Sequence, residues 1–409
     1  YLRWLQEEPF EELALNERHQ RDNIALLLKR SVAQVGEDAR LVLGLAGCLA
    51  FDLLSTAPMI ALLEGDERRC RKAINELVNY GLLERRDQGL HIGHALIHDY
   101  AAGHLPLSKE ALERVAWYYI FFCTAHSKAG VPGYARLDGE RVHCLRLIGA
   151  CLEGRLWQEV QGLVGAICVY LDRQGHWVEF ITAMEIRLTA ARKAEDRWSE
   201  AWCLNSLGYT CARRGEQEQA LAWFEQCLPL WRKLGHKEGE GVTLNNMAAI
   251  YDDLGKYEQA LETYQQSLSI SQEVDDRKGE GRTLNNIGML YRKQGDNEQA
   301  LQYYEQCLPI AQEIGNKIGE GATLNNIGNI YYAQGKYSKA ADYYKKALVI
   351  RREQGDRAGE AESCWNIGCT YEDLGDLAKA EEHIRLAVEI AEAMGHPSLE
   401  EWRDGLADT

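Results

Sequence analysis

Residues 241–320 contain two copies of one 40-residue block. The first copy reads GVTLNNMAAIYDDLGKYEQALETYQQSLSISQEVDDRKGE (241–280), and the second reads GRTLNNIGMLYRKQGDNEQALQYYEQCLPIAQEIGNKIGE (281–320). A fixed period of this length indicates a repeat architecture in which each block is one structural unit. We number the positions of a block as slots 1 to 40. Slot 15 is a glycine in each of five blocks: Gly215, Gly255, Gly295, Gly335 and Gly375.

Each block predicts a pair of helices. Slots 4, 7, 8 and 11 are mostly apolar, which is the spacing of one helix face, and slots 20, 24 and 27 form a second stripe. The slot-15 glycine suits the left-handed residue that ends a helix. We expect small residues at slots 8 and 20 to let the helices approach closely, with the aromatic residue of slot 24 filling the remaining space. We also expect Tyr291 and Tyr331, at slot 11, to be buried.

This pattern resembles the 40-residue variety of the tetratricopeptide repeat. Five blocks match, from Ala201 to Glu400. The resemblance implies an all-α superhelix, or α-solenoid, that binds a protein or peptide in its concave groove. The register extends backwards as degenerate hairpins over residues 138–200, with a helix break at Gly154. Ser398 and Glu401 form a sequence typical of a capping box, which predicts a final helix through Trp402.

The N-terminal third has a different character. Apolar patterns predict helices over residues 23–35, 39–54 and 66–80, followed by a short hairpin of residues 82–86 and 90–92. Three helices followed by a hairpin are typical of a winged-helix domain.

The segment after this hairpin, GHALIHDYA (residues 93–101), resembles the end of the winged-helix domain in STAND-type NTPases of the NB-ARC class. The family motif is Met-His-Asp, so His94 falls on its histidine while Gly93 and Ala95 replace the flanking residues. The resemblance implies that His94 contacts the ADP phosphate in the full-length protein, which would bind ADP or ATP. The chain contains no GxxxxGK[ST] phosphate loop, so we expect no ATPase activity from it and no cofactor in it.

Other interpretations of these residues stay open. His94 could instead be a core histidine that caps the junction between strand and helix. His91 and His98 lie near it, but no acidic residue completes a metal site, and we expect none. Arg68, Arg69, Arg71 and Lys72 begin the third helix, where DNA-reading winged helices place basic residues. A solvated helix face, or a docking face for the nucleotide module, fits an acidic chain better.

The asparagines at slots 5 and 6 are the most informative surface signal. Asparagine is a poor helix former, so its recurrence in the middle of the first helices has a cost. In the resembling family this stripe lines the groove, and the slot-6 asparagine binds ligand backbone. The alternative is a bond between neighbouring helices that sets repeat stacking, and both can hold. The candidate groove residues are Trp202, Asn205, Tyr209, Asn245, Asn246, Arg282, Asn285, Asn286, Arg292, Asn325, Asn326, Asn329, Tyr332, Trp365 and Asn366.

Composition narrows the function classes. With 46 Lys and Arg against 62 Asp and Glu, the formal net charge is −16, which disfavours nucleic acid as a partner. We find no apolar run of membrane-spanning length and no signal peptide, and the 12 cysteines form no CxxC pair. We therefore expect small buried thiols, no membrane contact and a cytoplasmic location. Glutamate pairs on the repeats are expected to face solvent. The sequence does not start with Met, which is consistent with a piece of a longer protein.

The predicted organisation is a winged-helix domain (1–104), a helical arm (105–200), five repeats (201–396) and a capping helix (397–409). We expect the regulatory and sensor region of a STAND signal-transduction protein, in which a protein or peptide trigger binds the groove and the winged helix holds the nucleotide module. The alternative is a non-catalytic tetratricopeptide scaffold or adaptor.

Overall fold

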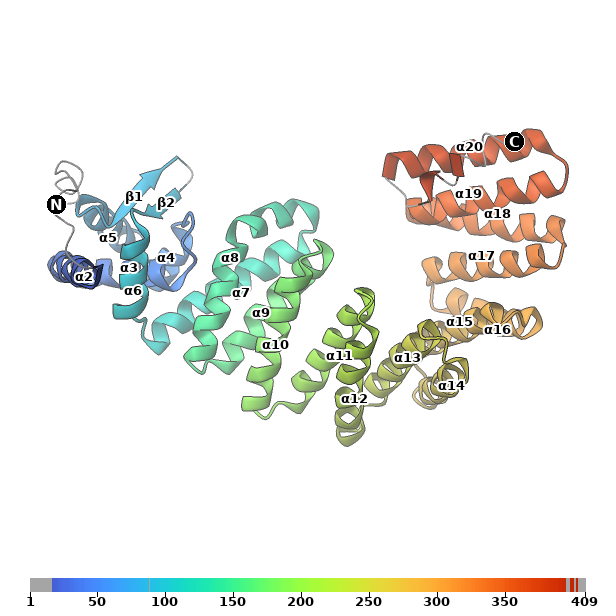
Figure 1. Cartoon of the computed structure of the whole chain (residues 1–409), viewed down its shortest axis with the longest axis horizontal. Helices are drawn as coiled ribbons and strands as arrows, with labels where there is room; N and C mark the ends of the chain where they lie inside the picture. The colour runs from blue at the N-terminus through green and yellow to red at the C-terminus, as the bar shows by residue number, and fades with distance from the viewer. Residues whose placement is uncertain (1–16, 88, 395–397, 401, 404–409) are drawn as a thin grey trace. The chain divides into compact units, whose positions relative to one another are not determined.

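The computed structural model describes residues 17–87, 89–394, 398–400 and 402–403 (Figure 1). In this part the chain forms 19 α-helices and one two-stranded hairpin, so the fold is all-α apart from that hairpin, as predicted. Two compact units divide between Thr210 and Cys211, within helix α11 (Arg197–Arg213). The boundaries predicted at 104/105, 200/201 and 396/397 stay predictions. None of the described helices is long and apolar enough to cross a membrane.

In the described part of the N-terminal unit, four helices and the hairpin come first. Their bounds are α2 Glu17–Gln34, α3 Glu37–Cys48, α4 Ala57–Leu62, α5 Glu67–Asn79, β1 Leu83–Arg86 and β2 Gly89–Ile92. The strands pair antiparallel, with Leu83 opposite Ile92. Helices α3 and α5, strand β1 and strand β2 follow the predicted order, and α6 (Ala95–His104) comes after them.

The prediction of one helix over residues 39–54 is wrong, and the short helix α4 was not expected. Helix α3 ends at Cys48, and Leu54 instead forms a β-bridge with Leu90 of β2. The two residues exchange backbone hydrogen bonds of 2.7 and 3.0 Å. Leu54 is buried, so its apolar side chain fits the helical pattern equally well. Long-range pairing with β2 satisfies the backbone groups that a continued helix would have used.

Four long helices follow in the same unit. They are α7 Lys109–Lys128, α8 Val131–Glu153, α9 Trp157–Arg173 and α10 Trp177–Lys193. The predicted break at Gly154 is confirmed, because α8 ends at Glu153 and Arg155 has a left-handed φ of 57°. Helix α8 begins at Val131, before residue 138, where the sequence indicated that the degenerate hairpins start.

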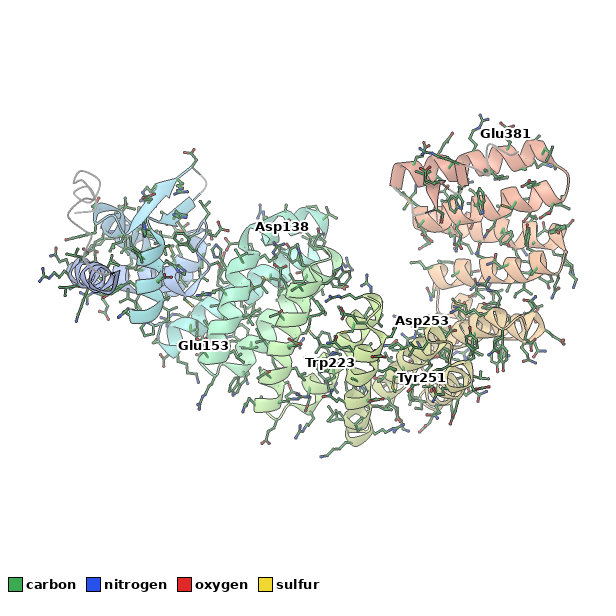
Figure 2. All side chains as sticks on the ribbon, viewed as in Figure 1. Asp138, Glu153, Trp223, Tyr251, Asp253 and Glu381 are labelled. Carbon is green, nitrogen blue, oxygen red and sulfur yellow. The ribbon has the colours of Figure 1, made fainter. Side chains whose placement is uncertain are left out.

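The C-terminal unit consists of helix hairpins. Their helices are α12 Gln217–Leu234, α13 Lys237–Asp253, α14 Tyr257–Glu273, α15 Arg277–Lys293, α16 Asn297–Glu313, α17 Lys317–Ala333, α18 Tyr337–Gln354, α19 Arg357–Asp373 and α20 Leu377–Met394. The slot-15 glycines all have positive φ, between 71° at Gly255 and 83° at Gly295. Each first helix therefore ends as predicted. Trp223 and Tyr251 border one of the hydrophobic clusters between these helices (Figure 2).

Within a repeat, slot 8 and slot 24 interlock as predicted. A Cβ atom added to Gly288 would lie 2.6 Å from Cε1 of Tyr304, and one added to Gly328 would lie 2.5 Å from Cε1 of Tyr344. Both tyrosines are buried. The absence of a side chain at slot 8 thus makes room for the slot-24 ring.

The expected burial of slot 11 is wrong. Tyr291 and Tyr331 are only half-buried, and each stacks on the slot-23 tyrosine of its own repeat. The ring centroids are 5.5 Å apart for Tyr291 and Tyr303 and 5.4 Å apart for Tyr331 and Tyr343. Slot 11 therefore lies at the edge of the helix pair, where an aromatic neighbour covers one ring face and solvent reaches the rest.

The last helix can be tested only in part. Glu401 of the predicted capping box and most of residues 397–409 lie outside the described residues. Trp402 is buried, and it stacks on Trp365 with a centroid distance of 5.3 Å. This contact agrees with the expectation that the C-terminal segment covers the last hairpin.

Candidate functional site

The asparagines of the repeats form hydrogen bonds from one repeat to the next. The slot-6 amide of Asn286 donates to the slot-5 carbonyl oxygen of Asn245 at 3.2 Å. Asn326 donates in the same way to Asn285, and Asn366 to Asn325, each at 3.2 Å. The ladder therefore links neighbouring first helices, which is the stacking role that the sequence left open.

Burial separates the two slots. Asn245 and Asn325 are only 3% and 2% exposed, so the expectation that they line a ligand groove is wrong. Their carbonyl oxygens are occupied inside the repeat interface, because Thr283 also donates to Asn245 and Arg351 to Asn325. Asn285 is half-buried.

The slot-6 side chains lie closer to solvent. We call these four half-buried residues the slot-6 row: Asn246, Asn286, Asn326 and Asn366. An asparagine amide offers two N–H donors and one carbonyl acceptor. For Asn286 the bond to Asn245 uses one donor, so the rest of the amide can serve a ligand.

A second set of contacts joins slots 12 and 13 of adjacent repeats. Lys293 pairs with the buried Asp252 at 2.8 Å, and Tyr332 donates to Asp373 at 2.6 Å. Burial, followed by this bond to Asp373, raises the pKa of Tyr332. Tyr332 is half-buried, so its hydroxyl is committed to the repeat interface rather than held ready for a ligand.

Two arginines flank the slot-6 row on α15. Arg282 and Arg292 are exposed. Arg292 lies beside Tyr304: burial raises the pKa of the Tyr304 hydroxyl, and the Arg292 guanidinium opposes that shift. On α17, the half-buried Asn329 accepts a bond of 2.7 Å from Tyr344. Asn329 therefore supports the hairpin as well as bordering the row.

The remaining candidates lie in the first and last repeats. Trp202 and Asn205 are half-buried and Tyr209 is 50% exposed, all within the N-terminal unit. The guanidinium of Arg187 lies 4.4 Å from the centre of a Trp202 ring. Trp365 is half-buried, and Trp402 covers part of it.

A ladder of buried glutamates at slot 40 was not predicted from the sequence. These residues are between 6% and 8% exposed, so the expectation of solvent-facing glutamates is wrong for Glu200, Glu240, Glu280, Glu320 and Glu360. Glu320 accepts bonds from Lys317 at 2.7 Å and Gln312 at 2.9 Å. Burial raises its pKa, but these two bonds and the positive charge of Lys317 together outweigh burial and leave the pKa lowered. The Gly-Glu pair that recurs at slots 39 and 40 was the sequence pattern that could have indicated these buried glutamates.

A capping residue at slot 36 starts each of these helices next to that glutamate. Asn316 accepts a bond of 3.1 Å from the backbone N–H of Gly319. A Cβ atom at Gly319 would lie 2.4 Å from Nδ2 of Asn316, so glycine leaves room for the cap. The first helices, which carry the slot-6 row, are thus fixed at their N-termini.

His94 is exposed, so the alternative of a core histidine is wrong in that respect. Its Nδ1 accepts a bond of 3.1 Å from the backbone N–H of Leu96, which makes it the N-cap of α6. His98 is buried and bonds the carbonyl oxygen of Leu49 at 2.9 Å. Within the described residues, no three His, Cys, Asp or Glu side chains are grouped to hold a metal ion.

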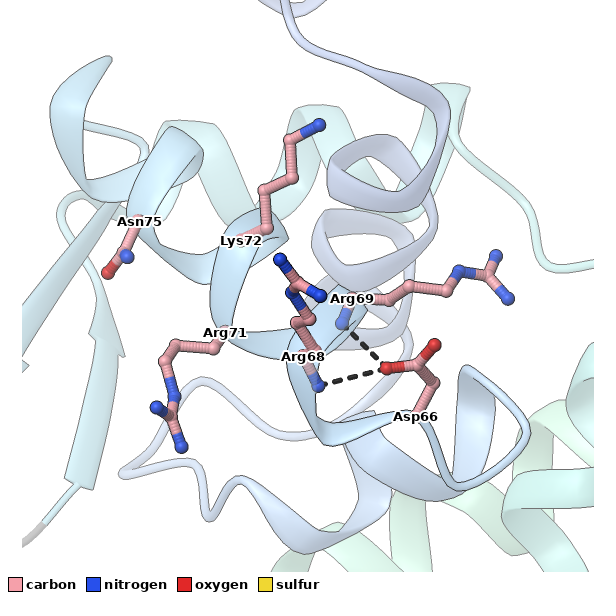
Figure 3. Close-up of a pocket in the computed structure, with 6 residues that line it drawn as sticks. All are labelled: Asp66, Arg68, Arg69, Arg71, Lys72 and Asn75. Atoms are coloured by element: carbon pink, nitrogen blue, oxygen red, sulfur yellow. Dashed lines mark hydrogen bonds between the residues drawn. The ribbon is translucent and has the colours of Figure 1, made fainter.

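The basic residues of α5 line a shallow hollow (Figure 3). Arg68, Arg71 and Lys72 are exposed, while Arg69 pairs with Asp38 at 2.6 Å. Asp66 caps the helix by accepting bonds from the backbone N–H groups of residues 68 and 69. One of the four cations is therefore already neutralised.

Comparison with known proteins identifies the repeats. Tetratricopeptide repeat family models match residues 201–234, 240–313 and 319–393. These repeats are therefore tetratricopeptide repeats. No curated protein matches the chain.

Solved structures with the same fold share little sequence. A STAND protein with a tetratricopeptide repeat sensor from Pyrococcus horikoshii has a TM-score of 0.54 at 16% identity, over 94% of this chain and 61% of that protein. Aspartyl phosphate phosphatase F from Bacillus subtilis has a TM-score of 0.53 at 15% identity, over 91% and 94%. The apo form of RapI has a TM-score of 0.51 at 15% identity, over 68% and 98%. These likenesses concern the fold alone.

Proposed function

We propose that the tetratricopeptide repeats bind an extended protein or peptide segment along the slot-6 row. The observation that carries this proposal is the half-buried position of Asn286, Asn326 and Asn366, each fixed by a bond to the preceding repeat. Because these amides are already oriented, little side-chain entropy is lost when a ligand binds them. One donor and acceptor pair per repeat can bond a peptide backbone whatever its sequence.

Positive charge beside the slot-6 row should favour peptides that carry acidic side chains. The exposed Arg282 and Arg292 lie on the same helix as Asn286. A guanidinium can bond a carboxylate with two parallel N–H donors, so an acidic side chain in the ligand would be favoured here. Lys293 already pairs with Asp252 and contributes less to such a preference.

The N-terminal unit supports a regulatory setting for these repeats. We propose that its helices, its hairpin and the Leu54–Leu90 bridge form a winged-helix domain of the STAND, NB-ARC type. His94 is exposed at the start of α6, so it can supply one contact to the phosphate of ADP in a nucleotide-binding module. One contact does not make a nucleotide site, so ADP or ATP would be held mainly by that module and any ATPase activity would reside there. The chain then acts as the regulatory and sensor region of a signal-transduction protein.

Panning a random peptide library against the chain tests the groove. Selected peptides should be rich in Asp and Glu. The double variant Arg282→Ala with Arg292→Ala should lose about 2–5 kcal/mol of binding free energy, as is typical when a hydrogen-bonded interface charge is removed. Arg68→Ala with Arg71→Ala is the matched control, since these arginines are also exposed but lie on α5. Equal binding by the groove variant and the wild type would refute the assignment.

A non-catalytic tetratricopeptide scaffold is the second candidate, because the slot-6 row would serve it equally well. His94 separates the two functions. In a protein that includes the nucleotide module, the STAND proposal expects His94→Ala to weaken ADP retention and raise basal signalling. If the chain is a scaffold, His94→Ala should change neither ADP retention nor basal signalling.

A further inference from the structure

Helix α18 carries a concentration of lysines that the slot-6 row does not use. It lies between α17 and α19 in the C-terminal unit (Figure 1). We define the α18 lysine patch as four exposed residues on this helix and the turn before it: Lys336, Lys339, Lys345 and Lys346. Although the chain has a formal net charge of −16, these four cations lie within 11 residues.

Tyrosine rings rather than carboxylates hold these lysines. The ammonium groups of Lys336 and Lys339 lie 5.8 and 5.4 Å from the centre of the Tyr331 ring, and that of Lys346 lies 5.1 Å from Tyr343. Lys345 lies 5.1 Å from the ring of Tyr371 and donates to its hydroxyl at 2.6 Å.

These contacts position the lysines without neutralising them. A cation–π contact or a bond to a neutral hydroxyl leaves the full positive charge available, whereas an ion pair does not. Within the described residues, no carboxylate lies within ion-pair distance of Lys339, Lys345 or Lys346. Lys379, which also lies over the Tyr371 ring, pairs with Asp376 and so falls outside the patch.

The other repeats show that the fold does not require these lysines. The positions equivalent to Lys339, Lys345 and Lys346 are all glutamine in the second repeat, at Gln259, Gln265 and Gln266. In the third repeat they are Gln299, Glu305 and Gln306. Both repeats form the same helix pair. The positive charge of α18 is therefore separable from its packing.

We propose that the α18 lysine patch is a second interaction surface, which binds a short acidic segment of a polypeptide independently of the slot-6 row. Lys339 and Lys346 are seven residues apart on α18, which is about 10 Å along the axis. An extended peptide covers that distance in about three residues. A cluster of a few aspartates or glutamates therefore matches the patch.

The geometry favours such a peptide over nucleic acid. Single-stranded nucleic acid is held by bases that stack on open aromatic faces. Here Tyr331 and Tyr343 stack on each other, and lysines cover their rings. Acidic residues such as Glu305 on α16 and Asp342 on α18 also limit the length of backbone that the patch could follow.

Fluorescence anisotropy with a labelled octaglutamate peptide tests the proposal on the full chain. At about 50 mM salt we expect binding that weakens as salt is added. The variant Lys339→Gln, Lys345→Gln, Lys346→Gln gives α18 the residues of the second repeat, so it should keep the fold. It should bind about tenfold more weakly, since each exposed ion contact contributes modestly. The charge-preserving change of the same three lysines to arginine should keep the affinity.

Two comparisons make the result specific. Lys193→Gln, Lys233→Gln, Lys278→Gln removes three exposed lysines elsewhere and should bind as wild type does. Octaglutamate can also bind along the slot-6 row, so the comparison is repeated in a chain that carries Arg282→Ala and Arg292→Ala. In that background the three α18 glutamine changes should still weaken octaglutamate binding about tenfold, so the patch can fail while the slot-6 row stands, or the reverse. Equal affinity of the α18 glutamine variant and the wild type would overturn the proposal. So would tighter binding of an oligothymidylate with the same number of charges.

Discussion

Replacing Asn245 with leucine should loosen the junction between the second and third repeats. Asn245 is buried, and its carbonyl oxygen accepts bonds from Thr283 and Asn286, both at 3.2 Å. Leucine has nearly the same size but no acceptor. Each lost bond costs about 1 kcal/mol, so Asn245→Leu should cost about 2 kcal/mol. The cost should not be larger, because Thr283 keeps its bond to Gly279 and the half-buried Asn286 amide can turn to water.

Native-state hydrogen exchange measures this loss locally. In a repeat protein each repeat contacts mainly the repeats next to it, so the loss of stability should stay close to the substituted residue. We expect protection of the amides in α13 and α15 to fall about 30-fold, which corresponds to about 2 kcal/mol, while protection in α20 stays the same. Asn285→Leu is the matched control: it removes one accepted bond, from Asn326, and should cost about half as much. An equal loss of protection in α20, or no loss at all, would refute the structural role of the ladder.

Three other changes have defined outcomes. Asp275 has a left-handed φ of 56°, and the equivalent turns of other repeats have glycine at this position, namely Gly235, Gly315 and Gly355. Because glycine adopts this conformation without strain, Asp275→Gly should raise the free energy of unfolding, measured in urea, by up to about 1 kcal/mol. A decrease would contradict this reasoning. The pKa of Glu320 is lower in the folded chain than its usual value of 4.5, so the ionised carboxylate stabilises the fold at pH values above 4.5. This stabilisation is lost as the pH falls through the lower pKa of the folded chain. Glu320→Gln should therefore destabilise the chain by about 1 kcal/mol at pH 7 and by less below pH 4; a pH-independent difference in urea unfolding would argue against it. The half-buried Cys369 should react with Ellman's reagent within minutes. The half-buried Cys48 should react more slowly, because burial raises its pKa to about 11. Rapid modification of the other, buried cysteines would be inconsistent with the packing.

Strong periodicity made the repeats predictable. Glycine at slot 8 and an aromatic residue at slot 24 recur together, and Gly288 against Tyr304 shows why: the ring occupies the place of the missing side chain. The turn at slot 15 was equally predictable, because a recurring glycine at the end of a helical pattern indicates a residue in the left-handed conformation.

Long-range contacts were less predictable. Leu54 fits the apolar pattern of a continued helix, but its pairing with Leu90 depends on a strand 36 positions away. Sequence could not tell Asn245 from Asn246, because adjacent helix positions differ by only about 100° around the axis and both residues suit a partly polar face. The burial of Glu320 depends on donors from two different helices, α16 and α17.

The binding role of the slot-6 row can be tested most directly with the double variant Asn286→Ala and Asn326→Ala. Its affinity should be measured by calorimetry for several selected peptides that differ in side-chain sequence. Since the asparagines would bond the ligand backbone, we predict a similar loss of about 2 kcal/mol for every peptide, including one in which the acidic residues are replaced by alanine. Unchanged affinity for all of them, in a variant that remains folded, would contradict the proposal that an extended polypeptide binds along this row.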